Sequence, residues 1–221
     1  KVFSLKYLIL SNTIKNRSYE RPDFWATTSN KQLIFVQHVK TLLKMNGKAA
    51  VVVPDNVLFE GGAGETVRRK LLHECDVHTL LRLPTGIFYA QGVKANVLFF
   101  DRKPASERPW TEAVWIYDLR TNMHFTLKTN TMKYEDLKDF IACYNPENRH
   151  ERRESERFKR FSFDELMQRD KVCLDIFWLK DESLEDSENL PAPEVLGRDI
   201  VENLEVALEQ FTSITEELEN R

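Results

Sequence analysis

The hydrophobic positions between residues 29 and 47 recur every three or four residues, which predicts an amphipathic helix. Ser29 and Gln32 have the spacing of a capping box at its start, and Gly47 is a typical stop. The stripe expected to face the core comprises Leu33, Val36, Val39 and Leu43. A second stripe, which widens the face that we expect to be buried, comprises Phe35, Val39 and Leu42.

Short apolar runs follow this helix. KAAVVVPDN, ended by Pro54, is typical of a strand that is buried on both faces of a parallel sheet. ETVRRKLLHEC predicts a helix, DVHTLLRLP a second strand, and the run from Val93 to Phe100 a third. The order helix, strand, helix, strand, strand predicts half of an open α/β sheet. VLFEGGAGE is expected to be a flexible loop, because it lacks the Lys-Ser/Thr of a P-loop and the spacing of a dinucleotide fingerprint.

The pattern changes after Asp101. KPASERPW reads as a linker, AVWIYDL as a strand and KYEDLKDFIACY as a helix. Residues 147–160 are nearly all charged and are expected to form a solvated helix or loop. Ser162 and Glu165 form another capping box, LDIFWL is too apolar to sit in water, and KDESLEDSENLPAP reads as an acidic linker.

The last segment predicts a helix with a heptad spacing of hydrophobic residues. This heptad seam comprises Ile200, Leu204, Ala207, Phe211, Ile214 and Leu218. A seam this short needs a neighbour, which is either the rest of its own domain or a helix of a partner subunit. The expected division of the chain is 1–28 (loop or remnant), 29–103 (sheet domain), 104–193 (mixed extension) and 194–221 (assembly helix).

Composition and charge exclude several classes of protein. No apolar run approaches the roughly 18 residues of a membrane span, so we expect a cytoplasmic protein. The three cysteines and five histidines have no ligand-like spacing, and no metal is expected. The net charge of −3 is uneven, because the segment from Lys180 onward is strongly acidic and the rest is basic. The basic part is equally compatible with nucleic-acid binding and with an ordinary solvated surface.

Two aromatic residues, Phe88 and Tyr89, stand just before the turn Ala90-Gln91-Gly92 that leads into the third strand. Ligands of open α/β sheets bind near strand ends, and a ring there is either part of the core or a platform for a flat group such as a base. Spacing alone identifies no catalytic triad and no carboxylate pair.

Two long stretches carry a resemblance to a known family: SNKQLIFVQHVKTLLKMNGKAAVVVPDNVLFEGGAGE and LRLPTGIFYAQGVKANVLFFD. They closely resemble the modification subunit of bacterial type I restriction–modification systems, a family of DNA methyltransferases that methylate the adenine amino group (N6) with S-adenosylmethionine. The likeness continues through IYDLRTNMHFTLKTN, NPENRHER and LDIFWLKDESLED and covers about residues 21–221. It implies an α/β fold: the C-terminal half of a Rossmann-like methyltransferase sheet, followed by a mainly helical region.

The family's two central motifs are missing from this sequence. The single Asn-Pro, at Asn145-Pro146, is followed by Glu147 rather than by the Pro of an NPPF motif, and no Gly-rich turn precedes Pro54. We therefore expect the chain alone to be inactive. One alternative is a naturally truncated, non-catalytic assembly module that binds a partner through its last helix. Another is a methyltransferase that acts on something other than DNA.

The resemblance also implies roles for particular residues. Phe35 matches an aromatic position against the adenine of the cofactor, and Phe88 matches a ring that stacks on the flipped-out target adenine. Gln91 and Lys94 are expected near the DNA backbone. The partners implied are DNA, a specificity subunit, a second modification subunit and a restriction subunit, with the heptad seam and LDIFWL as docking elements.

Overall fold

The computed structural model describes residues 21–90, 92–180 and 193–219, which form two compact units. The first unit contains the described residues up to His78 together with Leu98–Val114 and Ser162–Asp175. The second contains Thr79–Val97, Trp115–Phe161 and the described residues from Ile176 onward. Four strands of one sheet contribute residues to both units.

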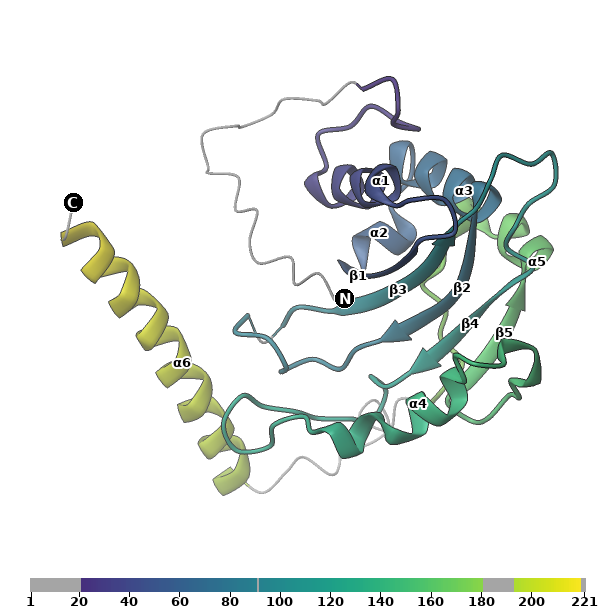
Figure 1. Ribbon diagram of the computed structural model, residues 1–221. Helices are drawn as coiled ribbons and strands as arrows, with labels where there is room; N and C mark the ends of the chain where they lie inside the picture. The colour runs from purple at the N-terminus through teal and green to yellow at the C-terminus, as the bar shows by residue number, and fades with distance from the viewer. Residues whose placement is uncertain (1–20, 91, 181–192, 220–221) are drawn as a thin grey trace. The chain divides into compact units, whose positions relative to one another are not determined.

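The sheet has five strands in the order β1-β3-β2-β4-β5 (Figure 1). The strands are β1 (Lys48–Pro54), β2 (Cys75–Arg82), β3 (Ala95–Arg102), β4 (Ala113–Asp118) and β5 (Phe158–Ser162). β2 and β4 are parallel, with Thr79 opposite Trp115. β3 runs against both of its neighbours: the end of β2 meets the start of β3 where the Leu83 N–H donates to Ala95 O, and Arg102, at the end of β3, meets the chain entering β1. The predicted α/β class is confirmed, as a mixed sheet.

The helices are α1 (Lys31–Leu42), α2 (Asn56–Phe59), α3 (Ala63–Glu74), α4 (Lys138–Tyr144), α5 (Phe163–Gln168) and α6 (Pro193–Glu219). Short 3₁₀ turns lie at η1 (Tyr134–Leu137), η2 (Arg149–Glu151) and η3 (Asp170–Val172). In the first unit α1, α2 and α3 lie together beside β1 (Figure 1). Among the described residues, no helix combines the length and the hydropathy needed to cross a membrane.

α1 was predicted correctly as a helix, but its start and its buried face differ from the prediction. Asn30, not Ser29, is the N-cap, and its side chain accepts hydrogen bonds from the backbone of Gln32 and Leu33. Phe35 is 36% exposed and Leu42 66% exposed. The predicted second buried stripe is therefore wrong, because α1 packs through a narrower face that contains Leu33, Val36 and Gln37.

β1 was predicted to be buried on both faces, and this is also wrong. Val51 and Val53 are buried, whereas Val52 between them is 55% exposed. Successive side chains of a strand point to opposite faces, so only one face of β1 is covered by the described residues. β1 is also the edge strand of the described sheet.

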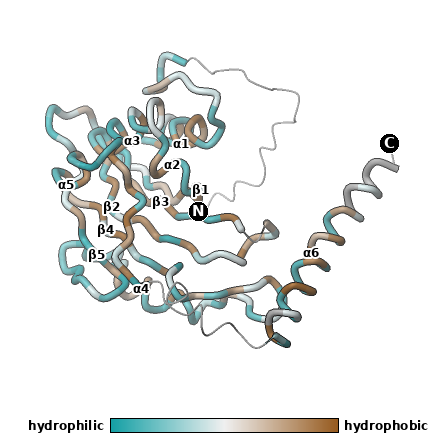
Figure 2. Tube along the Cα trace, turned by 180° about the vertical axis from the view of Figure 1, so that it is seen from behind, coloured by the Kyte–Doolittle hydropathy of each residue, from teal (hydrophilic) through white to brown (hydrophobic). Residues whose placement is uncertain are grey.

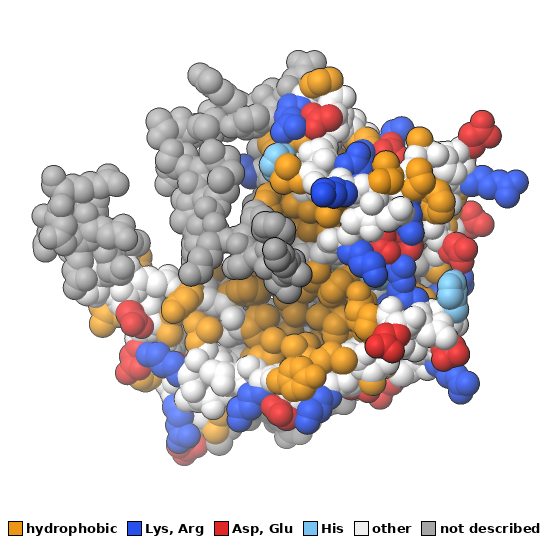
Figure 3. All heavy atoms as spheres, viewed as in Figure 1, with side chains coloured by type: hydrophobic (Ala, Val, Ile, Leu, Met, Phe, Trp, Pro, Cys, Tyr) orange, Lys and Arg blue, Asp and Glu red, His pale blue; other side chains and the backbone are white. Residues whose placement is uncertain are grey.

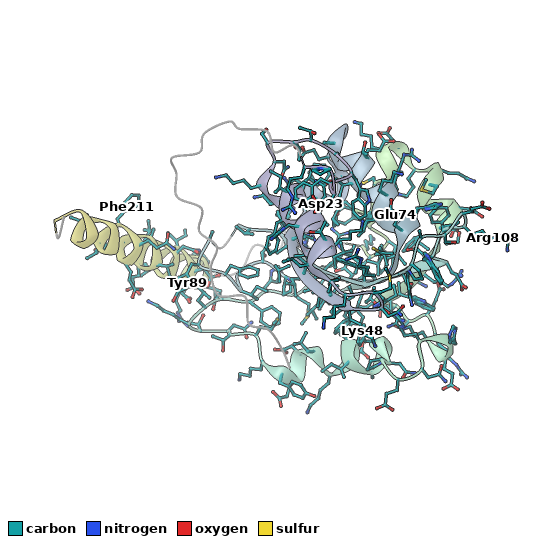
Figure 4. The ribbon with its side chains drawn as sticks, turned by 45° about the horizontal axis from the view of Figure 1, so that its top comes forward. Asp23, Lys48, Glu74, Tyr89, Arg108 and Phe211 are labelled. Atoms are coloured by element: carbon teal, nitrogen blue, oxygen red, sulfur yellow. The ribbon has the colours of Figure 1, made fainter. Side chains whose placement is uncertain are left out.

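The chain before α1 is attached to the helices of the first unit. The Trp25 indole N–H donates to Glu74 Oε2 over 2.8 Å, and Lys40 Nζ lies 3.2 Å from the same oxygen. Lys40 Nζ also lies 4.4 Å from the centroid of the Trp25 ring. Glu74, at the end of α3, is labelled in Figure 4. This cluster fixes the entry of the chain into α1.

The Gly-rich segment after β1 is more ordered than predicted, because it contains α2 and the first turn of α3. Arg68 of α3, which is only 2% exposed, holds this segment by hydrogen bonds to its backbone. Its guanidinium donates to Val57 O over 2.9 Å and to Glu60 O over 2.6 Å. The predicted flexible loop is thus a short helix tied to α3.

Arg68 also holds a distant part of the first unit. It donates to Lys171 O over 2.7 Å and to Val172 O over 3.0 Å. Lys171 and Val172 have φ angles of 53° and 50°, which are unfavourable for residues with a Cβ, above all for a β-branched one. We infer that the two hydrogen bonds help to hold this strained turn.

The second unit has an aromatic core around Tyr117 of β4. The ring of Tyr117 packs edge-on against Phe140 of α4 at 5.3 Å between centroids, and its hydroxyl donates to Asp139 Oδ2 over 2.6 Å. Phe158 of β5 lies 6.1 Å from Tyr117 and stacks on Trp115 at 4.8 Å. β5 begins inside the charged segment 147–160, for which no strand was predicted, so that interpretation is wrong from Phe158 onward.

The segment LDIFWL is partly buried in its own chain. Leu174 is 2% exposed and its N–H donates to Leu58 O, and Ile176 is 5% exposed. Phe177 is 61% exposed and lies under the guanidinium of Arg82, 3.9 Å from Cζ to the ring centroid. The prediction that this segment cannot remain in water is confirmed for two of its residues.

The heptad seam of α6 is largely uncovered by the described residues. Ile200, Leu204 and Phe211 of the heptad seam are 57%, 64% and 70% exposed, and Ala207 is half-buried. The side chains of Ile214 and Leu218 lie outside the described residues. The face toward the second unit contains Glu202 and Val206 instead, at 7% and 5% exposed. Hydrophobic positions recur along the helix in Figure 2.

Replacing Arg68 with Met should lower the free energy of unfolding by about 3 kcal/mol, because four carbonyl groups, two of them in buried hydrogen bonds, lose a charged donor. Urea denaturation followed by circular dichroism measures this loss. Arg69→Met is the matched control, since Arg69 is partly exposed and pairs with Glu65 on the same helix, so its loss should cost roughly 0.5 kcal/mol. Equal losses in the two variants would contradict the account.

Cys75 should resist alkylation in the native chain. Burial raises the pKa of its thiol to about 12, so the reactive thiolate is scarce at mildly alkaline pH. Cys143 and Cys173 are only partly buried. Iodoacetamide labelling followed by peptide mass spectrometry should modify these two in the native chain and Cys75 only after unfolding. Early labelling of Cys75 would show that β2 opens readily.

Candidate functional site

The aromatic loop, residues 83–94 between β2 and β3, is held at its base by the guanidinium of Arg120, in addition to the hydrogen bond from the Leu83 N–H to Ala95 O. Arg120 donates from Nε to Leu83 O over 3.0 Å and from Nη2 to Ala95 O over 3.0 Å. Nη2 also lies 3.3 Å from Oδ1 of the fully buried Asn96. The two ends of the loop are therefore held close together by a residue outside the loop.

Arg120 is itself fixed by the turn that follows β4. The buried Asp118 accepts hydrogen bonds at Oδ1 from the backbone N–H groups of Arg120 and Thr121, each over 2.8 Å. Arg157 donates to Asp118 O over 3.0 Å and to Thr121 O over 2.9 Å. Because the side chain of Asp118 and the guanidinium of Arg157 fix the same turn, Arg120 approaches the aromatic loop in one orientation.

Gly86 lets the aromatic loop lie directly on the chain after β4. Its φ is 81°, and a Cβ at this position would lie 1.8 Å from Phe125 O. No side chain fits in that space, and the left-handed backbone also favours glycine. Gly86 and Arg120 thus anchor the loop at two separate points.

The tip of the aromatic loop is exposed to solvent. Phe88 is half-buried, whereas Tyr89 is 73% exposed and Val93 40% exposed. The Val93 N–H donates to Ala90 O over 3.0 Å and closes the tip. Lys94 is exposed, and Gln91 lies outside the described residues.

α6 reaches the tip of this loop within the second unit. Gln210 Nε2 lies 3.4 Å from Tyr89 O. Figure 4 shows Tyr89 beside α6, with Phe211 farther along the helix and projecting from it. The exposed stripe of α6 and the aromatic loop therefore belong to neighbouring parts of one surface.

The chemistry of the aromatic loop favours binding over bond-making. From Leu83 to Phe100 the chain contains no acidic residue, while Lys94, next to Ala95, supplies a positive charge. The loop offers two rings, small side chains and one ammonium group. They suit a flat aromatic group next to an anion.

Phe35 lies in the first unit and Phe88 in the second, and each unit is described by itself. Near the start of α1, Asn30 Nδ2 donates to Glu60 Oε2 over 2.5 Å, and Asn56 Nδ2 lies 3.4 Å from the same oxygen. Asn56 Oδ1 is buried and has no hydrogen-bond partner among the described residues. This polar cluster lies after the carboxyl end of β1, where open sheets place ligands.

Sequence reasoning missed both Arg120 and the polar cluster. Asn30 and Asn56 each stand at a helix start that follows a strand or turn, a position that could have drawn attention to them. Arg120 gives no such signal, since its partners Leu83 and Ala95 are far away in the sequence. Gly86, in the dipeptide Thr-Gly before the aromatic pair, could have been identified as a required turn glycine.

Comparison with known proteins agrees with this architecture. Residues 2–176 match the family described as N-6 DNA Methylase. The chain is 41% identical over 223 residues to the methylase subunit of the type I restriction enzyme EcoKI from Escherichia coli K12, covering 86% of this chain and 42% of that protein. The StySJI methylase subunit of Salmonella typhimurium matches with the same identity and the same coverage.

Solved structures show the same relationship. The crystal structure of the EcoKI M protein superposes with a TM-score of 0.67 at 38% identity, covering 90% of this chain and 46% of that one. A modification subunit of a putative type I restriction enzyme from Vibrio vulnificus superposes with a TM-score of 0.55 at 26% identity, covering 66% and 30%. The chain spans less than half the length of the curated relatives that it matches most fully. By the extent of these matches, this chain belongs to the N-6 DNA methylase family.

Proposed function

We propose that these residues act as the C-terminal part of a type I modification subunit that methylates the adenine amino group in DNA. The observation that carries this proposal is the 41% identity to the EcoKI methylase subunit over 86% of the chain, which includes the region beyond the sheet. A match confined to the sheet would support only a methyltransferase of unspecified substrate. The exclusion of acidic residues from the aromatic loop supports DNA as the substrate.

In this proposal Phe88 stacks on the extruded target adenine. Its ring is half-buried, so its orientation is restricted, and the loop that carries it is anchored at Arg120 and Gly86. Extrusion of a base costs a few kcal/mol, and stacking on a preformed ring recovers part of that cost. Lys94 of the same loop is exposed, and in this proposal it meets the DNA backbone.

The cofactor proposed is S-adenosylmethionine, which supplies the methyl group when bound. Phe35 is exposed enough to cover the flat adenine ring of the cofactor. Glu60, held by Asn30 over 2.5 Å, is an acceptor of the kind that binds ribose hydroxyl groups. The chain lacks the Gly-rich and NPPF motifs, so we assign it one part of the cofactor site and not the transfer step itself.

The proposed partners are a specificity subunit, a second modification subunit and a restriction subunit. The stripe of exposed apolar side chains on α6 supports a protein partner, because such a stripe is stable only when another helix covers it. Its exposed members are Ile200, Val201, Leu204, Leu208 and Phe211. This stripe also supports the alternative function, a non-catalytic assembly module, and the two proposals differ in cofactor binding.

Cofactor binding should require both halves of the methyltransferase fold. Calorimetric titration with S-adenosylmethionine compares this chain alone, the preceding half of the EcoKI methylase subunit alone, and an equimolar mixture. We expect no binding to this chain alone and at least roughly tenfold tighter binding to the mixture than to the N-terminal half, because Phe35 completes the pocket.

The titration of the mixture is repeated with the variant Phe35→Ala. Phe59→Ala, at another exposed phenylalanine of the first unit, is the matched control. Only Phe35→Ala should weaken binding. If the mixture binds no better than the N-terminal half, the methyltransferase assignment fails and the assembly module is favoured. Tight binding by this chain alone would show that the cofactor site has been misplaced.

Phe88→Ala should slow methylation more than it weakens DNA binding. The variant is assayed in the complex with the N-terminal half and a specificity subunit. We expect the rate of methyl incorporation into unmethylated genomic DNA to fall roughly tenfold or more, because the stacking of one base on the ring is lost. Duplex affinity should stay unchanged within error. Tyr134→Ala, at an exposed aromatic residue of the same unit, is the control. An unchanged rate for Phe88→Ala would refute the stacking role.

A further inference from the structure

The polar loop, residues 119–133 after β4, has an unusual composition for a chain that is 30% charged. It contains no acidic residue, but carries Arg120, His124, Lys128 and Lys133. The remaining polar residues are threonine and asparagine. Lysine, threonine and asparagine side chains are common donors to DNA phosphates.

The middle of the polar loop is a preformed turn. Thr126 Oγ1 accepts hydrogen bonds from the N–H groups of Thr129 over 3.1 Å and Asn130 over 2.8 Å. The Thr126 N–H donates to Asn130 O over 2.9 Å, and Asn130 Nδ2 donates to His124 O over 2.5 Å. Because these bonds are internal, the turn keeps its shape while the side chain of Lys128 points outward and remains 51% exposed.

The polar loop is attached to the aromatic loop at both anchors described above. Arg120, its second residue, bridges Leu83 O and Ala95 O, and Phe125 O lies against Gly86. A base that stacks on the aromatic loop therefore has its flanking nucleotides next to a surface without negative charge on either loop. Figure 3 shows Lys and Arg side chains, interspersed with Asp and Glu side chains, at the lower edge of the molecule, where the polar loop and α4 lie.

Two glutamates of α6 face the polar loop. Glu205 Oε2 lies 4.0 Å from Lys128 Nζ, with both side chains more than half exposed, and Glu202 Oε2 accepts a hydrogen bond from Thr129 Oγ1 over 2.9 Å. A pair as exposed as Lys128 and Glu205 contributes little to stability, because water and salt screen it. It leaves Lys128 able to exchange this partner for a phosphate.

We propose that the polar loop binds the phosphodiester backbone of DNA through Lys128 and Lys133, beside the nucleotide that the aromatic loop receives. This inference rests on the proposed function, because it takes DNA as the substrate. It assigns the sequence-independent part of DNA binding to a segment outside the sheet and outside the aromatic loop.

The test is binding of this chain to a fluorescein-labelled duplex, followed by anisotropy across a series of salt concentrations. The double variant Lys128→Gln/Lys133→Gln should weaken binding and reduce the slope of log K against log salt by about 2, one unit for each phosphate contact. The matched control is Lys44→Gln/Lys70→Gln, which removes the same charge from exposed positions of the first unit. Circular dichroism melts confirm that both variants fold.

An equal loss in both double variants would overturn the proposal, since it would show a general effect of net charge. Unchanged DNA binding in the Lys128/Lys133 variant would also overturn it, and so would a parent chain that does not bind the duplex. None of these results changes the outcome of the cofactor titration, so failure of the polar loop and failure of the methyltransferase assignment are distinguishable.

Discussion

The hydrogen bonds from Arg120 to Leu83 O and Ala95 O are the constraint on which the functional surface depends. β2 and β3 are neighbours in the sheet, and the chain that joins them must leave the sheet and return to it. A loop of this length without an anchor would sample many conformations, which is costly for binding. Arg120 holds the base of the loop, Gly86 lies directly against Phe125 O, and the tip remains exposed to solvent.

The same constraint explains why the candidate functions converge on one surface. The turn after β4, fixed by Asp118 and Arg157, orients Arg120 and begins the polar loop. One buried carboxylate therefore supports both the aromatic loop and the segment that we assign to DNA phosphates. α6 touches both loops through Gln210 and Glu202, so a protein that binds the exposed stripe of α6 would act close to the proposed DNA surface.

Local patterns predicted the elements of the fold well and its long-range contacts poorly. α3, the capping box of Ser162 with Glu165 and the terminal helix follow from spacing alone and are confirmed. β5 was missed because its strand character depends on pairing with β4: Asp118 N–H donates to Arg157 O in a segment that looks uniformly charged. Phe35 and Leu42 look like core residues by period, yet the face that α1 buries is set by its neighbours. Arg68 and Arg120 act through distant carbonyl groups that no local pattern reveals.

The most direct test of the methylase assignment is the chemical identity of the product. Unmethylated genomic DNA is incubated with S-adenosylmethionine, a specificity subunit and the two halves of the modification subunit, and its nucleosides are analysed by mass spectrometry. The account predicts N6-methyladenine that appears only when this chain is present. Methylation of cytosine, or N6-methyladenine formed equally well without this chain, would contradict it.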